Sequence, residues 1–290
     1  MSGIYSPPST GTASSVFTEP VTFNATNDPA TVSPNTLKLY GKSVSGRMLA
    51  KIKSSSGLDF PLQPSLFQNQ IAIISCSSGT ANPTAFGTGI SASGTINHTY
   101  NESLGYVLNL TTAATANSTA GISNATTMWQ RGNVAGSNGF FFSLRIAFPD
   151  ASYSELRAFA GFYSFTLPTA VNSSDNPVGD LIGFRYSTTA GDINFQITAK
   201  DNTTLAAVDT GMPFTPSQVY DLYLFNPPAP NGDTVGWKID NLSLGTSNSG
   251  IISTNLPRYG FGLRSGFQIC NIGAVARKVA FQRLYCESDR

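Results

Sequence analysis

The chain of 290 residues has a net charge of +1, and charged residues make up 11% of it, against a usual share of about 25%. Nucleic acids and anionic membranes attract concentrated positive charge, so this balance gives no electrostatic reason to expect either as a partner. Hydrophobic residues at 40%, with 19 Phe and 11 Tyr, argue against disorder. The length suits one large all-β domain or two small ones.

The shortage of charge is deepest between Ser54 and Gln130, where Asp59 and Glu102 are the only acids and the sequence has no Lys or Arg. A stretch this neutral must be solvated by Ser, Thr, Asn and Gly or covered by other subunits. The second explanation predicts a protein that assembles with copies of itself, rather than a free monomeric enzyme.

The first segment in chain order, residues 1–36, is rich in Ser, Thr, Pro and Asn with scattered apolar residues. Such a segment buries too little apolar surface to fold alone, so we expect an extended N-terminal arm that becomes ordered against a partner. Its Met1 end lacks the basic and then apolar pattern of a signal peptide, and no run in the chain reaches the ~18 apolar residues that span a bilayer. We therefore expect synthesis in a cytoplasm and no membrane insertion.

Residues 37–68 differ from the arm because apolar residues recur there among basic ones. No acid lies between Asp28 and Asp59, while the basic residues of this region are Lys38, Lys42, Arg47, Lys51 and Lys53. We interpret them as a solvated or subunit-contacting strand edge. Together, residues 1–68 are predicted to form an arm and docking connector, and residues 69–290 a β domain.

The pattern beyond residue 69 is that of strands. Apolar residues alternate with a second face at Phe140, Phe142, Leu144, Ile146 and Phe148, and again at Ile193, Phe195, Ile197 and Ala199, which is the period of two of a half-buried strand. Further candidates are 71–76, 128–130, 157–164, 181–187, 219–225, 235–239, 259–264, 267–271 and 278–286. The best hairpin joins 219–225 to 234–240 through a Pro-rich turn. Short strands, frequent turns and no helical period predict an all-β fold of antiparallel sheets, a β-sandwich or jelly roll.

Candidate catalytic residues are few. His98 is the single histidine, and the sequence has no G-x-S-x-G serine for it to activate, so we interpret it as an exposed loop residue. Asp150 and Glu155 are the nearest local pair of acids for glycoside cleavage, which needs two carboxyl groups about 5–9 Å apart. Their surroundings indicate a polar loop after the Phe140 strand. We predict no catalytic residue.

Metal and cofactor sites are not predicted either. No D-x-[DN]-x-[DN]-G loop occurs, and Cys76, Cys270 and Cys286 show no C-x-x-C spacing, so we expect buried free thiols. Trp129 and Trp237 would stack on sugar rings if they were exposed. Each lies in a strand pattern, which favours packing in the core.

Several segments resemble a group of tailed-bacteriophage virion proteins. Residues 39–51 (LYGKSVSGRMLAK) carry G-R-M-L, and residues 56–67 (SGLDFPLQPSLF) carry S-G-L-D followed by L-Q-P. Residues 139–148 (GFFFSLRIAF), 220–228 (YDLYLFNPP) and 281–287 (FQRLYCE) are similar to strands of the same group. The likeness covers most of the chain from about Leu37 onward.

The resemblance implies a tail-fibre or appendage subunit of the virion, with a concanavalin-like or jelly-roll domain and usually a homotrimer. It offers no catalytic motif. The expected partners are copies of the chain, other tail or capsid proteins, and a host-surface glycan or protein receptor. The motif residues expected to dock on the virion or contact another subunit are Arg47, Met48, Leu49, Leu58, Asp59, Phe60, Leu62, Pro64 and Phe67.

Three functions therefore stay open at the level of the sequence. The leading hypothesis is a structural virion protein that attaches to the host by many weak contacts, multiplied over several copies. A capsid decoration or head-fibre protein is the second. The third is a polysaccharide-cleaving tail enzyme that would use Asp150 or Glu155.

Overall fold

The computed structural model describes residues 22, 24–26, 36–54, 59–61, 70–75, 88–91, 94–101, 105–124, 127–131, 139–165, 174–227 and 232–288. Every regular element in these ranges is a β-strand. The chain divides into two compact units, one of Met1–Ser43 with Met48–Gln63, the other of Val44–Arg47 with Pro64–Arg290. No helix in the described ranges is long and apolar enough to cross a membrane.

The first unit contains a three-stranded sheet in the order β1-β2-β3. Its strands are β1 (Leu37–Val44), β2 (Arg47–Ser54) and β3 (Asp59–Pro61). Ser45 and Gly46 between β1 and β2 have φ values of 53° and 89°, which suits a tight two-residue hairpin turn. The segment read from the sequence as a connector is thus largely β-structure, while the predicted division at residues 68 and 69 stays a prediction.

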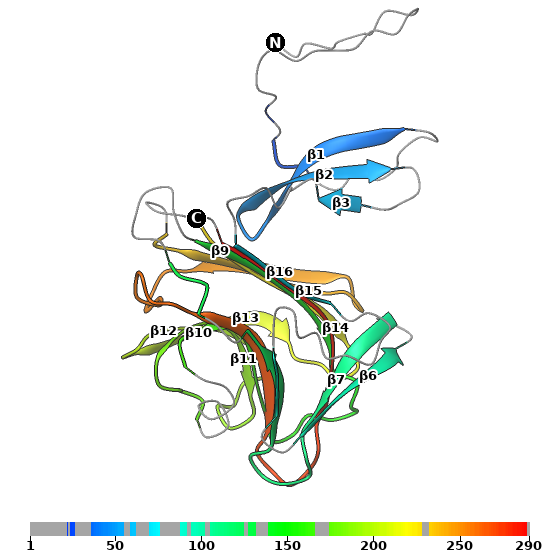
Figure 1. Ribbon diagram of the computed structural model, residues 1–290, viewed down its shortest axis with the longest axis vertical. Coiled ribbons are helices and arrows are strands. Elements are labelled where there is room, and N and C mark those ends of the chain that lie inside the picture. Colours follow the sequence, from blue (N-terminus) through cyan, green and yellow to red (C-terminus); the bar gives the residue numbers. More distant parts are fainter. Residues whose placement is uncertain are drawn as a thin grey trace, which may run out of the picture. The chain divides into compact units, whose positions relative to one another are not determined.

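The second unit is a sandwich of two antiparallel sheets, in which β10 to β13 form one layer and β9 with β14 to β16 lie in the other (Figure 1). The seven-stranded sheet has, in spatial order, β13 (Leu205–Pro213), β12 (Asn194–Asp201), β11 (Asp180–Ser187), β10 (Leu156–Tyr163), β17 (Arg264–Asn271), β8 (Thr119–Ser123) and β5 (Thr88–Ser91). Neighbouring strands pair antiparallel throughout. The all-β sandwich expected from the sequence is confirmed.

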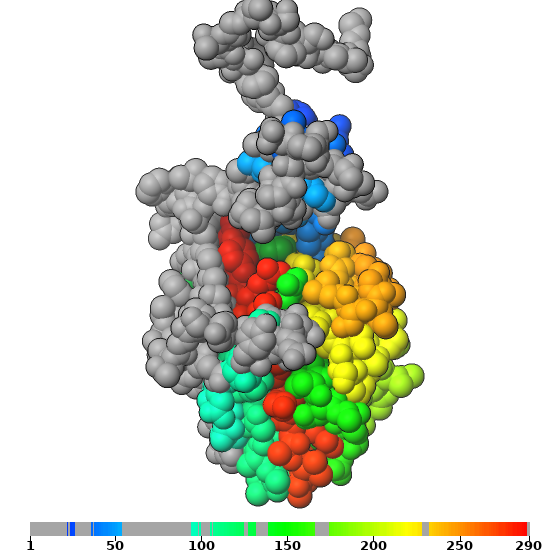
Figure 2. Space-filling view, turned by 90° about the vertical axis from the view of Figure 1, so that its right-hand side faces the viewer, coloured from blue at the N-terminus to red at the C-terminus, as the bar shows by residue number. Residues whose placement is uncertain are grey.

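The eight-stranded sheet has, in spatial order, β16 (Thr246–Ile252), β15 (Val235–Asn241), β14 (Val219–Asn226), β9 (Phe140–Ala147), β18 (Lys278–Ser288), β7 (Gly105–Thr111) and β6 (Thr95–Asn101), while β4 (Gln70–Ser75) pairs with β18. The predicted hairpin is confirmed by the pairing of Tyr223 with Lys238. Among the described strands, β16 has β15 as its single partner, and its orange residues lie at the surface in Figure 2.

Aromatic side chains fill the space between the sheets. Phe140 and Phe142 of β9 point into this core, and their ring centroids lie 4.4 and 5.5 Å from that of Phe162 on β10. Trp129 joins the same group at 5.9 Å from Phe162. Complete burial of one such side chain stabilises the fold by roughly 1.5–3 kcal/mol. The inward face predicted for β9 is therefore correct.

The outer face of the seven-stranded sheet is also packed, over a row of glycines. Gly266, Gly161 and Gly183 lie opposite one another on β17, β10 and β11. A Cβ atom would lie 2.9 Å from the Phe159 ring at Gly183 and 2.5 Å from the Tyr163 hydroxyl at Gly266. The missing side chains thus leave room for the two rings, which form a second apolar cluster with Leu181.

The turn of the β1–β2 hairpin, Val44–Arg47, belongs to the sandwich unit. The Nη2 atom of Arg47 lies 2.6 Å from Oε2 of Glu287, and the guanidinium carbon lies 4.7 Å from the ring centroid of Phe141. Arg47 and Glu287 are 9% and 3% exposed. Both charges are shielded from water, so each depends on the other for compensation. The buried ion pair therefore holds the turn on the sheet.

Four details of the sequence reading are wrong. Residues 259–263 are not a strand, because Gly260 takes a φ of 71° in a turn and β17 begins at Arg264. The strand predicted at 128–130 shrinks to a bridge between Trp129 and Leu263. His98 lies in β6 rather than in a loop. Ile193 is 79% exposed and precedes β12 instead of pointing into the core.

Substitution of Glu287 by Ala is expected to destabilise the sandwich by about 3–5 kcal/mol, because the Arg47 charge stays buried without its carboxylate. Urea unfolding followed by intrinsic fluorescence measures the change. The matched control is Asp240→Asn, which removes the half-buried partner of Lys238 at 2.7 Å and is expected to cost about 1 kcal/mol or less. Equal effects of the two substitutions would show that the Arg47 pair does not secure the turn.

Candidate functional site

The residues predicted from the phage-like motifs fall into three groups. Arg47 lies buried on the sandwich, as described above. Met48 is 46% exposed and Leu49 is half-buried, and both lie on β2 in the first unit. The structure describes the strand but not the side chains of Asp59 and Phe60, and the remaining predicted residues lie outside the described ranges: Leu58, Leu62, Pro64 and Phe67. Their docking role stays a prediction.

The acids considered for catalysis show no paired arrangement in the described part of the chain. Asp150 accepts a hydrogen bond from the backbone N–H of Lys278 through Oδ2 at 2.7 Å. Glu155 is exposed in the turn before β10 and has a φ of 57°. Both lie in the loop after β9, as the sequence indicated. Within the described ranges, no group of three or more His, Cys, Asp or Glu side chains is arranged to hold a metal ion.

The two tryptophans and two of the cysteines are internal. Trp129 and Trp237 are 0% and 6% exposed, so the prediction that they pack in the core is correct. Cys270 and Cys286 are buried free thiols, as expected, while Cys76 lies outside the described ranges. Neither tryptophan is available to a ligand, so an aromatic binding surface must use other residues.

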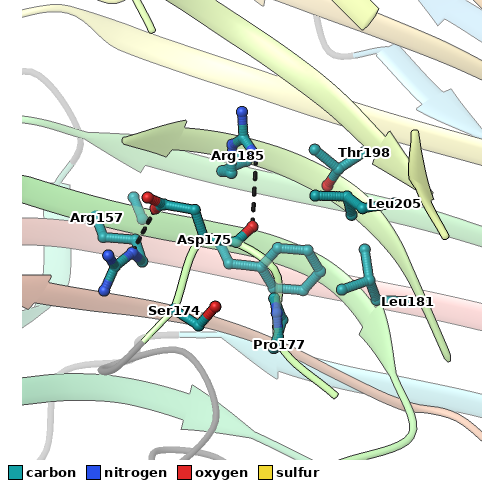
Figure 3. Close-up of a pocket in the computed structure, with 10 residues that line it drawn as sticks. Arg157, Ser174, Asp175, Pro177, Leu181, Arg185, Thr198 and Leu205 are labelled. Atoms are coloured by element: carbon teal, nitrogen blue, oxygen red, sulfur yellow. Dashed lines mark hydrogen bonds and ion pairs between the residues drawn. The ribbon is translucent and has the colours of Figure 1, made fainter. Parts of the chain in front are cut away.

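A small cavity lies beside the segment around Asp175, on the outer face of β10 to β12 (Figure 3). Asp175 accepts hydrogen bonds from Arg157 Nε at 2.6 Å, Ser187 Oγ at 2.5 Å and Thr189 Oγ1 at 2.7 Å. Arg185 donates to the Asp175 carbonyl at 3.4 Å. The cavity measures about 10 Å³, which is room for about one water molecule. These contacts anchor a loop and leave no space for a larger ligand.

Among the residues of the sandwich that the structure describes, the two most exposed aromatic side chains lie between β16 and β17, in the turn formed by residues 258–261. Tyr259 and Phe261 are 40% and 44% exposed. The N–H of Phe261 donates to the carbonyl of Arg258 at 3.4 Å, and Gly260 takes the positive φ that the third position of such a turn requires. We call Arg131, Asp233, Arg258, Tyr259 and Phe261 the aromatic rim.

Each ring of the aromatic rim rests on a guanidinium group. The carbon of the Arg131 guanidinium lies 4.1 Å from the Tyr259 ring centroid, and that of Arg258 lies 3.6 Å from the Phe261 ring centroid. Cation–π contacts of this length orient a ring as well as stabilise it. One face of each ring is therefore occupied from within the protein.

Arg131 is held by backbone carbonyl groups of two other loops. Its Nη1 donates to the Pro257 carbonyl at 2.6 Å, and its Nε and Nη2 donate to the Gly232 carbonyl at 3.2 and 2.9 Å. Burial lowers the pKa of Arg131, while the nearby Asp233 opposes that change. Arginine remains charged in proteins, so these carbonyl oxygens and Asp233 compensate a cation whose side chain is 7% exposed.

Arg258 is fixed by Asp180 at the start of β11. Asp180 Oδ1 accepts the backbone N–H of Arg258 at 2.8 Å, and Oδ2 accepts Nη2 at 2.8 Å. The Asp180 side chain is 1% exposed. A buried carboxylate with two orienting bonds makes this turn an extension of the sheet rather than a free loop.

Asp233 supplies the most exposed charge of the aromatic rim. Its side chain is 79% exposed, and its carboxylate accepts a hydrogen bond from the Tyr259 hydroxyl. That bond raises the pKa of Tyr259 above its ordinary value, because ionisation would place two negative charges together. The rim thus combines two apolar ring surfaces with one accessible acceptor.

Sequence reasoning missed this site. The run Tyr259-Gly260-Phe261-Gly262-Leu263 alternates large and small residues, which resembles a strand with small residues on one face. The signal that could have found it is the pair of glycines flanking Phe261, which is typical of a turn. Asp233 lies far away in the sequence, and its bond to Tyr259 depends on the tertiary fold.

Comparison with known proteins shows the fold alone. No protein-family model matches the chain, and no curated protein is significantly similar to it. A protein of unknown function from Shewanella oneidensis is similar in structure, with a TM-score of 0.56, 12% identity, and coverage of 77% of this chain and 87% of the other. Peanut lectin, solved with a peptide, is similar with a TM-score of 0.54, 13% identity, and coverage of 77% and 98%. The lectin UEA-II complexed with galactose is similar with a TM-score of 0.53, 15% identity, and coverage of 77% and 100%. The sandwich is thus of the concanavalin-like type.

Acid is expected to loosen the Asp175 anchor. Burial alone would raise the pKa of Asp175, but the hydrogen bonds from Arg157, Ser187 and Thr189 outweigh burial and lower it from 3.8 to about 2. A carboxyl group with a lowered pKa stabilises the fold fully above its unfolded pKa, and this contribution is lost as the pH falls through the folded value. The difference in free energy of unfolding between the protein and its Asp175→Asn variant should therefore be constant above about pH 5 and shrink progressively as the pH falls toward 2. Urea unfolding at several pH values measures it, and a difference independent of pH would contradict the anchor.

Proposed function

We propose that this chain is a non-enzymatic structural protein of a tailed-bacteriophage virion, a tail fibre or baseplate appendage subunit, and that its sandwich attaches to host-surface glycans through the aromatic rim. Two independent lines support the proposal. The motifs around Arg47 and Leu58 resemble virion proteins, and the lectins peanut lectin and UEA-II share the fold. The virion assignment rests on the first line, and the glycan on the second together with the rim.

The exposed ring surfaces of Tyr259 and Phe261 are the single observation that carries the binding proposal. Each ring has a guanidinium on one face and is about two-fifths exposed. Large apolar rings that stay in water at fixed positions are typical of binding surfaces. The apolar C–H face of a sugar ring fits such a surface, while its hydroxyl groups reach neighbouring acceptors such as Asp233.

Rigidity is the second reason to assign binding to this place. The rings are fixed through Arg131 and Arg258, which are bonded to the Gly232 carbonyl and to Asp180. A ligand therefore meets a surface that is already ordered and pays little entropy to order it. Single contacts of this kind are weak, and several copies on one particle multiply them.

Assembly and docking complete the proposal. The low share of charged residues favours packing against identical chains, and we take a homotrimer as the assembly. The three-stranded sheet of the first unit offers exposed apolar side chains for docking on the virion, including Leu39 at 43% and Met48 at 46%. Strand pairing through backbone hydrogen bonds suits such docking because it demands little of the sequence.

Substitution of Tyr259 or Phe261 by Ala is expected to weaken glycan binding at least about tenfold each, as for a central aromatic residue of an interface. Binding to host envelope polysaccharide is measured by biolayer interferometry with the intact protein. Circular dichroism should stay unchanged, because both side chains are exposed and their loss leaves the core intact.

The matched control is Ile251→Ala, which removes an apolar side chain that is 70% exposed on β16, and it should bind as the unmodified protein does. Equal losses with all three variants, or none with the rim variants, would contradict binding at the rim. Release of reducing sugar from the polysaccharide would contradict the non-enzymatic assignment.

Antibody-gold labelling of phage particles that carry the chain is expected to mark the tail or an external tail appendage. The same particles examined by cryo-electron microscopy should show the protein in copies related by a threefold axis. Labelling of the head shell would instead support a capsid decoration or head-fibre protein and contradict the tail assignment.

A further inference from the structure

We propose that Asp233 restricts the aromatic rim to neutral glycans, because it is the most exposed charge of the site and acts as an acceptor for sugar hydroxyl groups. The inference rests on the proposed function and names the ligand class of the same site. It makes Asp233 a specificity-determining residue.

The charges of the aromatic rim are balanced before any ligand arrives. Arg258 is paired with Asp180 through Nη2 at 2.8 Å, and Arg131 lies 3.8 Å from Asp233. Arg131 has also committed its Nε, Nη1 and Nη2 atoms to the carbonyl oxygens of Gly232 and Pro257. An acidic sugar that drew the Nε and Nη2 atoms of Arg258 away from Asp180 would leave that carboxylate buried with an uncompensated charge.

The negative charge of the aromatic rim is more accessible to a ligand than its two positive charges. The Asp233 side chain is 79% exposed, against 7% for Arg131 and 42% for Arg258. A ligand that lies on the Tyr259 ring therefore meets a carboxylate beside the ring, since the Tyr259 hydroxyl is hydrogen-bonded to that carboxylate. The positive charge of Arg131 lies on the covered face of the same ring.

A carboxylate accepts hydrogen bonds and donates none when ionised. Sugar hydroxyl groups are donors, so a neutral pyranose satisfies both the ring and Asp233. A uronic acid or another carboxylated sugar brings a like charge to the same place, and like charges in an interface select against the wrong partner. The surface thus combines attraction for hydroxyl groups with exclusion of acids.

The test compares two polysaccharides with related backbones, neutral galactan and polygalacturonate, on the intact protein by biolayer interferometry. The protein is expected to bind galactan and to bind polygalacturonate at least about tenfold more weakly. Galactan binding should change little between low and high salt, because no net charge pairing drives it.

Asp233→Asn keeps the size of the side chain and an acceptor oxygen while removing the charge. It should weaken galactan binding by about tenfold, the loss expected when a hydrogen bond to a charged group becomes one to a neutral group. It should also strengthen polygalacturonate binding, so that the ratio of the affinity for galactan to the affinity for polygalacturonate falls. Asp209→Asn is the matched control, because it removes another exposed carboxylate, on β13, and changes the net charge equally.

The outcomes separate this inference from the proposed function. Binding that depends on Tyr259 but favours polygalacturonate, or an unchanged preference in Asp233→Asn, would overturn the neutral-glycan inference and leave glycan binding at the rim intact. Binding of neither polymer, nor of host envelope polysaccharide, would overturn the proposed function itself. A similar fall in this ratio with Asp209→Asn would show that net charge, rather than Asp233, sets the preference.

Discussion

The guanidinium of Arg131 is the contact on which the candidate site depends. It joins the loop that follows Trp129 to the carbonyl groups of Gly232 and Pro257, and it lies under the Tyr259 ring. Three segments distant in the sequence are thereby held at one place by one buried cation. Because a planar guanidinium donates in fixed directions, it fixes the orientation of these loops as well as their distance. The positions of the exposed rings follow from these buried contacts of Arg131.

The loops that Arg131 joins are held rigidly because the sandwich beneath them is packed on both sides of the seven-stranded sheet. Phe162 packs against the rings of Trp129, Phe140 and Phe142 between the sheets. On the outer face, Phe159 and Tyr163 lie over the row of glycines. A sheet covered on both faces resists bending, so the start of β11, where Asp180 holds Arg258, is a firm support for the turn.

The sequence carried enough information for the sandwich but not for the site. Strands such as β9 and the β14–β15 hairpin are recognisable because one face is strongly apolar and the turn between them is rich in proline. The edge strands were missed because β13 shows no regular alternation of polar and apolar residues and β16 begins with a run of small polar ones, so their pairing comes from neighbours rather than from their own pattern. Lys200 lies on the face of β12 opposite Phe195 and Ile197, yet it is 5% exposed because Asn176 and the Pro177 carbonyl bind its ammonium group at 2.7 Å. Contacts of this kind join residues far apart in the chain, and no local pattern encodes them.

Scarcity of charge links the rim to the proposed assembly. Charged side chains are few, and in the described parts of the sandwich most carboxylates meet a basic partner or a backbone N–H, as Asp180, Asp221 and Asp192 do. An accessible carboxylate such as Asp233, whose charged neighbour is the buried Arg131 at 3.8 Å, therefore stands out on a surface that carries few other charges. In the proposed assembly, one weak and selective contact per subunit would suffice, because several copies on one particle would present the same contact and multiply both the affinity and the selectivity. A surface crowded with charge would bind more tightly per copy at low salt, but it would lose both the selectivity and the neutral faces that the proposed assembly needs.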